Sequence, residues 1–327
     1  MRILFIGGTG IISSACSKLA CELGHEVYLL CRGQSPRALP DGAKVLKGDV
    51  RDRASAERAL GDLTFDSVAD FIAFETAHIE NALQLFQGRT RQYVFISSAS
   101  AYKKPVDHWP ITEATPLHNP FWEYSRNKIA CEERLLRAYR EQGFPMTVVR
   151  PSHTYDRTLL PFDPHGGGYT VLKRMLAGKP LVVHGDGTSL WVLTHHRDFA
   201  KGFLGLLGHP KAVGETFHIT SDEVLTWNQI FTIVGNAAGV SPTLVHVPSD
   251  VIAKHDPAWG AGLLGDKAHS VIFDNTKLKR LVPDFVASVP FRQGAAEIVE
   301  FYAANPGFAP VRPDLDELMD RLVKAAG

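Results

Sequence analysis

The chain has 327 residues, of which 45% are hydrophobic and 21% charged, a composition typical of a globular protein with one large domain or two. Basic and acidic residues both number 35, and the resulting zero net charge gives no general attraction to nucleic acid or to an anionic membrane surface. No apolar run approaches the ~20 residues of a membrane helix, and the N-terminal run is too short for a signal-peptide core. The four cysteines lack the C-x-x-C spacing, which favours reduced thiols. We therefore expect a cytoplasmic protein without nucleic-acid or membrane partners.

Short apolar runs alternate with helical patterns over the first part of the chain. The runs are Arg2–Ile6, Glu26–Cys31, "DSVADFIAF", "QYVFISS" and "PMTVVRP". Nearly continuous apolar strands that alternate with helices predict a parallel sheet covered on both faces, as in a Rossmann-type doubly wound α/β fold. Ligands of such sheets lie at the carboxyl ends of the strands.

The pattern changes after Pro151. A Pro- and Gly-rich loop is followed by shorter, mixed elements, among them "LVVHGDGTSLWVLT", which predicts a β-hairpin turned at Gly185–Gly187. We predict a dinucleotide-binding domain over residues 1–158, to which residues 190–212 return. A smaller mixed α/β substrate lobe is expected over residues 159–189 and 213–327, and it ends in a helix that begins near Asp314.

The glycine-rich turn "GGTGIIS" lies between the first strand and the first helix. Gly7, Gly8 and Gly10 permit a tight turn and let backbone amides approach a pyrophosphate at the helix N-terminus. Ser13 stands where the usual fingerprint has its third glycine, and it is small enough for close packing. The sequence predicts a dinucleotide site, and the alternative is a purely structural turn. Its further members are Thr9, Ile11 and Ile12.

The second strand ends at Cys31 and Arg32, where an acidic residue usually binds the ribose 2′-hydroxyl of NAD. An arginine there suits a 2′-phosphate, so NADP is favoured over NAD. The alternative is a solvated surface arginine. Asp49 follows a third strand and is placed to accept a hydrogen bond from the adenine amino group, unless it only ends the strand or caps a helix.

Two tyrosines each precede a lysine by four residues, Tyr124 with Lys128 and Tyr169 with Lys173. Spacing alone does not choose between them. Tyr124 follows a strand that ends in serine at Ser98, and a serine at a strand end lies at the ligand edge of the sheet. Tyr169 has only a Gly/Pro loop before it, so we interpret it as a packing residue of the lobe.

The motifs "GGTGIIS", "FISSASAY", "YSRNK" and "VVRPSHTYD" occur in the order and at the spacing of the extended short-chain dehydrogenase/reductases. Over its whole length the chain resembles atypical members of this NAD-dependent epimerase/dehydratase family. The resemblance implies that Ser98 hydrogen-bonds the reacting hydroxyl or carbonyl and that Tyr124 is the general base. Lys128 would bind the nicotinamide ribose and lower the tyrosine pKa, which agrees with the effect of a nearby cation on a phenolate.

The resemblance extends the expected cofactor contacts along the strand ends. These further contacts are Val50, Phe71, Ile72, Ala73, Ser97, Pro151 and His153. It also implies a homodimer, in which the Tyr124 helix would present Leu135, Leu136 and Tyr139 to a second subunit.

Departures from the family pattern limit the substrate. Ala99 and Ser100 stand where the sugar 4,6-dehydratases carry an Asp-Glu pair, so dehydration is not expected. Trp191 stands where nucleotide-sugar enzymes carry an arginine that grips the diphosphate. We expect a free sugar or polyol, with Ser98, Ala99, Ser100, His153 and Trp191 as candidate contacts. His195 and His196 are adjacent, so their side chains point apart, and no carboxylate-rich partner set is evident in the sequence; no metal site is expected.

Three functions remain open at this point. The first is a redox epimerase, which includes a nucleotide-sugar 4-epimerase. The second is a net dehydrogenase or reductase acting on a sugar-like alcohol. The third is a non-catalytic RNA-binding or redox-sensing member of the fold, against which the Ser98, Tyr124 and Lys128 set and the zero net charge argue.

Overall fold

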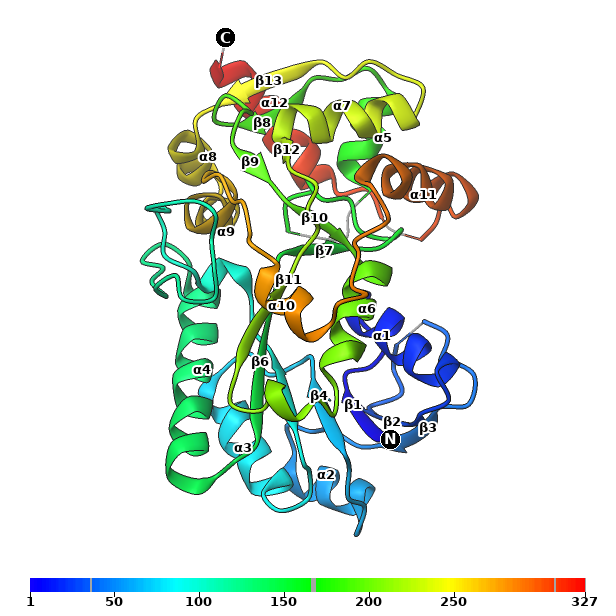
Figure 1. Cartoon of the computed structure of the whole chain (residues 1–327). Coiled ribbons are helices and arrows are strands. Elements are labelled where there is room, and N and C mark those ends of the chain that lie inside the picture. The colour runs from blue at the N-terminus through cyan, green and yellow to red at the C-terminus, as the bar shows by residue number, and fades with distance from the viewer. Residues whose placement is uncertain (36, 166–168, 309, 327) are drawn as a thin grey trace.

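The computed structural model describes residues 1–35, 37–165, 169–308 and 310–326. Its centre is a seven-stranded sheet in the order β11-β6-β5-β4-β1-β2-β3, in which every neighbouring pair is parallel (Figure 1). The strands are β1 (Arg2–Ile6), β2 (Glu26–Cys31), β3 (Lys44–Lys47), β4 (Ser67–Asp70), β5 (Tyr93–Ile96), β6 (Met146–Pro151) and β11 (Thr216–Ile219). The strand order reverses between β1 and β4, and ligands of such sheets bind at this switch point. The predicted doubly wound fold is confirmed.

Helices cover both faces of the sheet, as the apolar strands require. Ile3 and Phe5 of β1 point into one core, whereas Leu4 and Ile6 point into the other, because successive side chains of a strand face opposite ways. The helices are α1 (Ile11–Glu22) and α6 (His196–Leu206) on the first face, and α2 (Arg53–Leu60), α3 (Thr76–Phe86) and α4 (Glu123–Gln142) on the second.

The rest of the chain forms a smaller lobe with its own hydrophobic core above the carboxyl ends of the strands (Figure 1). It holds three two-stranded sheets, β10-β7, β12-β9 and β13-β8. Their strands are β7 (His153–Tyr155), β8 (Leu181–His184), β9 (Leu190–Trp191), β10 (Leu193–His195), β12 (Leu225–Thr226) and β13 (Leu244–Val247). The helices are α5 (Thr170–Leu176), α7 (Trp227–Ala237), α8 (Ser249–His255), α9 (Pro257–Gly262), the π-helical turn η3 (Leu263–Lys267), α11 (Phe291–Ala304) and α12 (Pro313–Ala326). The helix α10 (Thr276–Leu281) packs against the main sheet instead.

Two expectations about this part of the chain are wrong. The stretch 181–194 is not a hairpin, because β8 pairs in parallel with β13, β9 pairs with β12, and β10 pairs with β7. The turn at Gly185 forms, but each strand after it finds a distant partner. In addition, β11 joins the main sheet beside β6, and Leu278 of α10 packs in the core below it. The segment 213–327 is therefore not a separate lobe in its entirety.

The terminal helix α12 buries Leu315, Leu318 and Leu322 in the core of the lobe, as its helical spacing predicts. Within the described residues, no helix combines the length and the apolar character that crossing a membrane requires.

Candidate active site

The glycine-rich turn leaves no room for side chains at its first two positions. Gly7 adopts a φ of 76°, and a Cβ atom there would lie 2.5 Å from Cγ2 of Ile72. A Cβ atom at Gly8 would lie 2.6 Å from Cδ2 of Leu29. Any larger residue would therefore clash as well as strain the backbone at Gly7. The turn is a bare backbone surface at the carboxyl end of β1.

Ser13 replaces the missing third glycine with two hydrogen bonds. Its Oγ donates to the carbonyl of Gly7 over 2.6 Å and accepts from the amide of Gly10 over 2.8 Å. The side chain is buried, so the serine holds the turn closed from within. The hydroxyl thus adds direct hydrogen bonding to the close packing that a small residue permits.

A cavity of about 280 Å³ lies beside this turn, at the ends of β1, β2 and β3. Its lining includes Gly7, Thr9, Arg32, Asp49, Val50 and Ile72. The structure thus brings together cofactor candidates from four separate segments. Arg32 is exposed at the rim, and Asp49 accepts a hydrogen bond from the amide of Arg51 over 3.0 Å.

Arg37 also lines this cavity and was not anticipated from the sequence. Its Nη1 donates to Oδ2 of Asp156 over 2.5 Å, and its Nη2 donates to Oγ1 of Thr158 over 2.6 Å. These bonds tie the segment after β2 to the segment after β7. No local pattern reveals such a link, because the partners are more than 100 residues apart in sequence.

Lys128 occupies the second turn of α4 and is almost fully buried at 1% exposure. Its Nζ donates to the carbonyls of Ala73 and Ile96, each over 2.7 Å, and lies 4.5 Å from the ring centre of Phe74. Burial lowers the pKa of Lys128 to about 8. The ammonium is therefore held at the carboxyl ends of β4 and β5, at the ligand edge of the sheet.

Tyr124 lies one helical turn before Lys128, and the hydroxyl of Ser98 acts to lower the pKa of Tyr124. A chain of hydroxyls runs inward from Ser98: its Oγ lies 2.9 Å from Oγ of Ser100, which accepts from Oγ of Ser125 over 2.8 Å. Tyr124 and Ser125 are adjacent on α4, and the end of β5 supplies the two other serines.

The pKa of Tyr124 runs against the expectation. Burial, with a smaller effect from Asp266, raises the pKa of Tyr124 to about 12, and the nearby hydroxyl of Ser98 opposes this rise. We expected Lys128 to lower this pKa, but in this structure its ammonium is bonded to two backbone carbonyls. Desolvation of the phenolate therefore outweighs the attraction of the cation.

Several candidates are buried beneath the site instead of lining it. Ala99 and Ser100 are 6% and 3% exposed, and Ser100 acts by holding Ser98. The hydroxyl of Ser97 is bonded to Glu132. Among the remaining cofactor candidates, Phe71 packs in the core beside α1 and Ala73 donates its amide to Asp70 over 3.0 Å.

A buried ion pair fastens α4, the helix that carries Tyr124, to the sheet. Glu132 of α4 pairs with Arg150 of β6, with Nη2 and Oε2 2.5 Å apart, and their side chains are 7% and 6% exposed. The same carboxylate accepts from Ser97 at the end of β5. One carboxylate thus joins the helix that carries Tyr124 to two strand ends.

Residues 3–220 match the model of the NAD dependent epimerase/dehydratase family. The chain belongs to this family. The family's cofactor is a nicotinamide dinucleotide, and the structure fits it: the glycine turn exposes backbone without side chains at Gly7 and Gly8 beside an open cavity, and Lys128 lies at the strand ends beyond it.

Two relatives in this family show how broad the similarity is. The 2′-dehydrokanamycin reductase of Streptomyces kanamyceticus is 28% identical over 98% of this chain and 91% of its own length. The chloroplast stem-loop binding protein of 41 kDa b of Arabidopsis thaliana is 31% identical over 75% of this chain. This chain covers only 65% of that protein's length.

Solved structures of the family share the fold. The UDP-glucose 4-epimerase of Bifidobacterium longum, in complex with NAD+ and UDP, aligns with a TM-score of 0.75. It is 20% identical, and the alignment covers 94% of this chain and all of the epimerase chain. The dTDP-glucose 4,6-dehydratase of Bacillus anthracis, in complex with NAD, aligns with a TM-score of 0.75 at 20% identity, over 94% of this chain and 98% of its own.

The lobe that faces the strand ends holds a second cavity of about 430 Å³. Trp122, His153 and Lys267 line its side nearest Tyr124. Nδ1 of His153 accepts a hydrogen bond from Nε1 of Trp191 over 3.2 Å. Burial lowers the pKa of His153 to about 3, so the ring is neutral and its Nε2–H is left to donate.

Trp191 is buried at 3% exposure and packs against Trp227, with ring centres 5.2 Å apart. Little of its ring is therefore open to a sugar, and it acts on the cavity by orienting His153. The aromatic ring that lines the cavity beside Tyr124 is Trp122, whose ring centre lies 4.9 Å from that of Tyr124.

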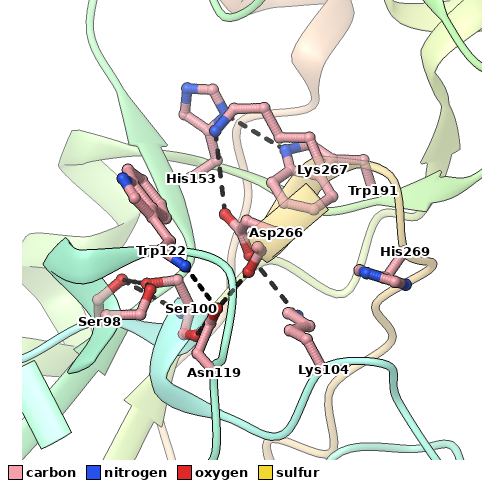
Figure 2. Close-up of polar contacts among 12 residues, drawn as sticks. Ser98, Ser100, Lys104, Asn119, Trp122, His153, Trp191, Asp266, Lys267 and His269 are labelled. Carbon is pink, nitrogen blue, oxygen red and sulfur yellow. Dashed lines mark hydrogen bonds and ion pairs between the residues drawn. The ribbon is translucent and has the colours of Figure 1, made fainter. Parts of the chain in front are cut away.

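Asn119, Asp266 and Lys267 complete this region and were missed from the sequence. Nδ2 of Asn119 donates to the carbonyls of Ser100 and Gly265, over 2.9 and 2.6 Å, and so joins the serine chain to the lobe. Figure 2 shows Asp266 between Lys104 and Lys267. Asp266 and Lys267 lie more than 140 residues after Tyr124, so no local signal reveals them, whereas Asn119 lies near Tyr124 but in a loop whose contacts only the fold sets.

Tyr169 packs away from this chemistry. Its ring stacks on Tyr302 with centres 5.1 Å apart, which confirms its interpretation as a packing residue. His195 and His196 are engaged separately: Nε2 of His195 lies 3.3 Å from Glu297, and Nδ1 of His196 lies 3.1 Å from the carbonyl of Ile11.

Proposed function

We propose that this chain is an NAD(P)-dependent oxidoreductase or epimerase that acts on a secondary alcohol or ketone of a sugar-like substrate. The observation that carries the proposal is the buried ammonium of Lys128 at the carboxyl ends of β4 and β5, one helical turn after Tyr124, whose pKa the hydroxyl of Ser98 acts to lower. Ile72 lines the cavity beside the glycine turn and Trp122, which packs against Tyr124, lines the cavity of the lobe.

The roles follow from the chemistry of each group. Ser98 would donate to the oxygen of the reacting carbon and hold it beside Tyr124. Tyr124, as phenolate, would take the hydroxyl proton of an alcohol, and as phenol it would return that proton to a ketone. Bound nicotinamide would accept or return the hydride of the same carbon. Lys128 would bind the nicotinamide ribose.

A substrate without a diphosphate is favoured by two observations. Trp191 fills the place of the family's diphosphate arginine and is buried. The relative matched over 98% of this chain is named for the reduction of 2′-dehydrokanamycin, which supports a net reductase as strongly as an epimerase. A nucleotide-sugar 4-epimerase is the second candidate, supported by the family and by the shared fold of the UDP-glucose 4-epimerases.

The experiment that tests the proposal follows reduced nicotinamide by its absorbance while the purified protein turns over a panel of sugars and polyols. A net dehydrogenase changes this absorbance in step with product. An epimerase forms product without a lasting change. Failure to bind either nicotinamide cofactor would refute the enzymatic proposal.

We predict that UDP-glucose, UDP-galactose and dTDP-glucose are poor substrates. A diphosphate brings about two negative charges into the site, and leaving them unpaired in a partly buried cavity costs several kcal/mol. Calorimetry with UDP and UDP-glucose measures this directly. Dissociation constants in the low micromolar range would contradict the prediction and favour the 4-epimerase.

Arg32→Ala is expected to weaken NADP binding by about tenfold or more and to leave NAD binding nearly unchanged. Arg32 lies exposed at the rim of the cavity beside the glycine turn, where its charge is free to meet a 2′-phosphate. Titrating both cofactors against both proteins is the measurement. Tighter binding of NAD than of NADP to the unmutated protein would overturn the preference.

The expected homodimer stays a prediction, with a smaller set of contacts. Leu135 lies in the core of its own subunit, so it does not serve as an anchor, whereas Tyr139 is 38% exposed. Light scattering at micromolar concentration is expected to give twice the mass of the chain, and a monomeric mass would refute the dimer.

A further inference from the structure

Lys267 reaches into the cavity of the lobe from a firmly held backbone. Its carbonyl accepts three hydrogen bonds, from Nε2 of His184 over 3.0 Å, Oγ of Ser189 over 3.2 Å and Nε1 of Trp227 over 3.2 Å. It ends the π-helical turn η3, a local structure often found at functional sites. The backbone of Lys267 is thus fixed in place, and most of its side chain is buried among aromatic rings.

The ammonium of Lys267 lies close to the proposed chemistry. Nζ is 5.5 Å from the ring centre of Trp122 and 5.8 Å from that of Trp191. Trp122 in turn packs against Tyr124. Among the residues that the structure describes, none accepts a hydrogen bond from this Nζ, and its closest carboxylate is Asp266 at 3.9 Å.

That carboxylate is shared. Oδ1 of Asp266 lies 3.6 Å from Nζ of Lys104, whose side chain is completely buried. Two lysine side chains therefore face one carboxylate, as Figure 2 shows. Burial lowers the pKa of Lys104, which is enclosed by protein, so a substrate meets the ammonium of Lys267, with Asp266 3.9 Å away and shared with Lys104. Beside it, the neutral His153 leaves a second hydrogen-bond donor in the cavity.

We propose that Lys267 binds a carboxylate of the substrate, so that the preferred substrates are sugar acids, uronate-like compounds with one negative charge. The inference rests on the proposed function, because it assigns the substrate class of the same site. One carboxylate supplies the acceptor that the Lys267 ammonium lacks, whereas a diphosphate would bring about two negative charges to a single ammonium and a neutral sugar would offer it no charged acceptor. A preference for a single negative charge also agrees with Trp191 standing where the family's nucleotide-sugar enzymes carry the arginine that grips the diphosphate.

Among the described residues that line this cavity, Asp163 is the one whose charge would oppose the binding of a carboxylate, so the test must address it. It is 8% exposed, and burial raises its pKa to about 7. A substrate amine would suit this carboxyl, as a substrate carboxylate suits Lys267. The two possibilities predict opposite charge preferences, and binding measurements separate them.

The experiment measures binding of glucuronate, glucose, glucosamine and glucose 6-phosphate to the cofactor-loaded protein by calorimetry. We expect glucuronate to bind roughly ten- to hundredfold more tightly than glucose, the range of a charge-assisted hydrogen bond. Lys267→Met, which keeps the apolar stem between the rings, should remove this preference, and Lys267→Arg should retain most of it. Lys254→Met is the matched control, since Lys254 lies on the surface of α8 with its side chain 75% exposed.

Four results would overturn the inference. They are equal binding of glucuronate and glucose, stronger binding of glucosamine or glucose 6-phosphate than of glucuronate, an undiminished preference in Lys267→Met, and no binding of any of the four at millimolar concentration.

Tyr124→Phe separates the inference from the proposed function. If no compound is turned over but glucuronate binding still depends on Lys267, then only the redox function fails. If turnover depends on Tyr124 but not on the substrate's charge, then only the inference fails.

Discussion

Tyr124→Phe is expected to reduce turnover roughly 10³-fold while leaving the fold and the cofactor affinity nearly intact. Only the hydroxyl is lost, and with it the group that would transfer the proton beside Ser98. The ring remains packed beside Trp122 and Phe74. The measurement compares kcat and cofactor affinity of the variant with those of the unmutated protein, with any sugar that the panel identifies as a substrate.

Tyr169→Phe is the matched control, because Tyr169 also precedes a lysine by four residues but stacks on Tyr302 in the lobe. It should change turnover little. Lys128→Met should lower both turnover and cofactor affinity, since Lys128 lies at the strand ends where the ribose is expected. Activity that survives in Tyr124→Phe and disappears in Tyr169→Phe would reverse the choice between the two pairs.

Glu132→Ala is expected to lower the free energy of unfolding by about 3–5 kcal/mol. The substitution leaves the guanidinium of Arg150 buried without its partner and removes the acceptor of Ser97. Chemical denaturation measures the loss. Turnover should fall as well, because the pair fastens α4, and so Tyr124, to β5 and β6.

Glu133→Ala tests whether the loss belongs to the buried pair. Glu133 neighbours Glu132 on the same helix but is exposed, so its removal should change stability by less than about 0.5 kcal/mol. Replacing both Glu132 and Arg150 with methionine should recover most of the stability, because no unpaired charge is then left buried. A double variant as unstable as Glu132→Ala would show that the ion pair is not the cause.

Local sequence patterns predict the strands, turns and helical spacings of this protein that depend only on residues close together in the chain. The apolar strand before Gly7 predicts a buried β1 and the turn that follows it, because both depend on residues that are adjacent in sequence. The pairing of Tyr124 with Lys128 follows from helical geometry, and the place of Ser98 follows from the end of an apolar strand. These inferences hold because periodicity and spacing act over one or two turns of a helix or one strand.

Tertiary structure decided what lies between distant segments. The strands of the expected hairpin at Gly185 find other partners, since pairing depends on which strands the whole lobe brings together. Burial sets the pKa of Tyr124, and no residue type or spacing encodes burial by itself. Asp266 and Lys267 reach the site from more than 130 residues beyond Tyr124, so their charges meet the chemistry only after packing has closed the lobe over the strand ends.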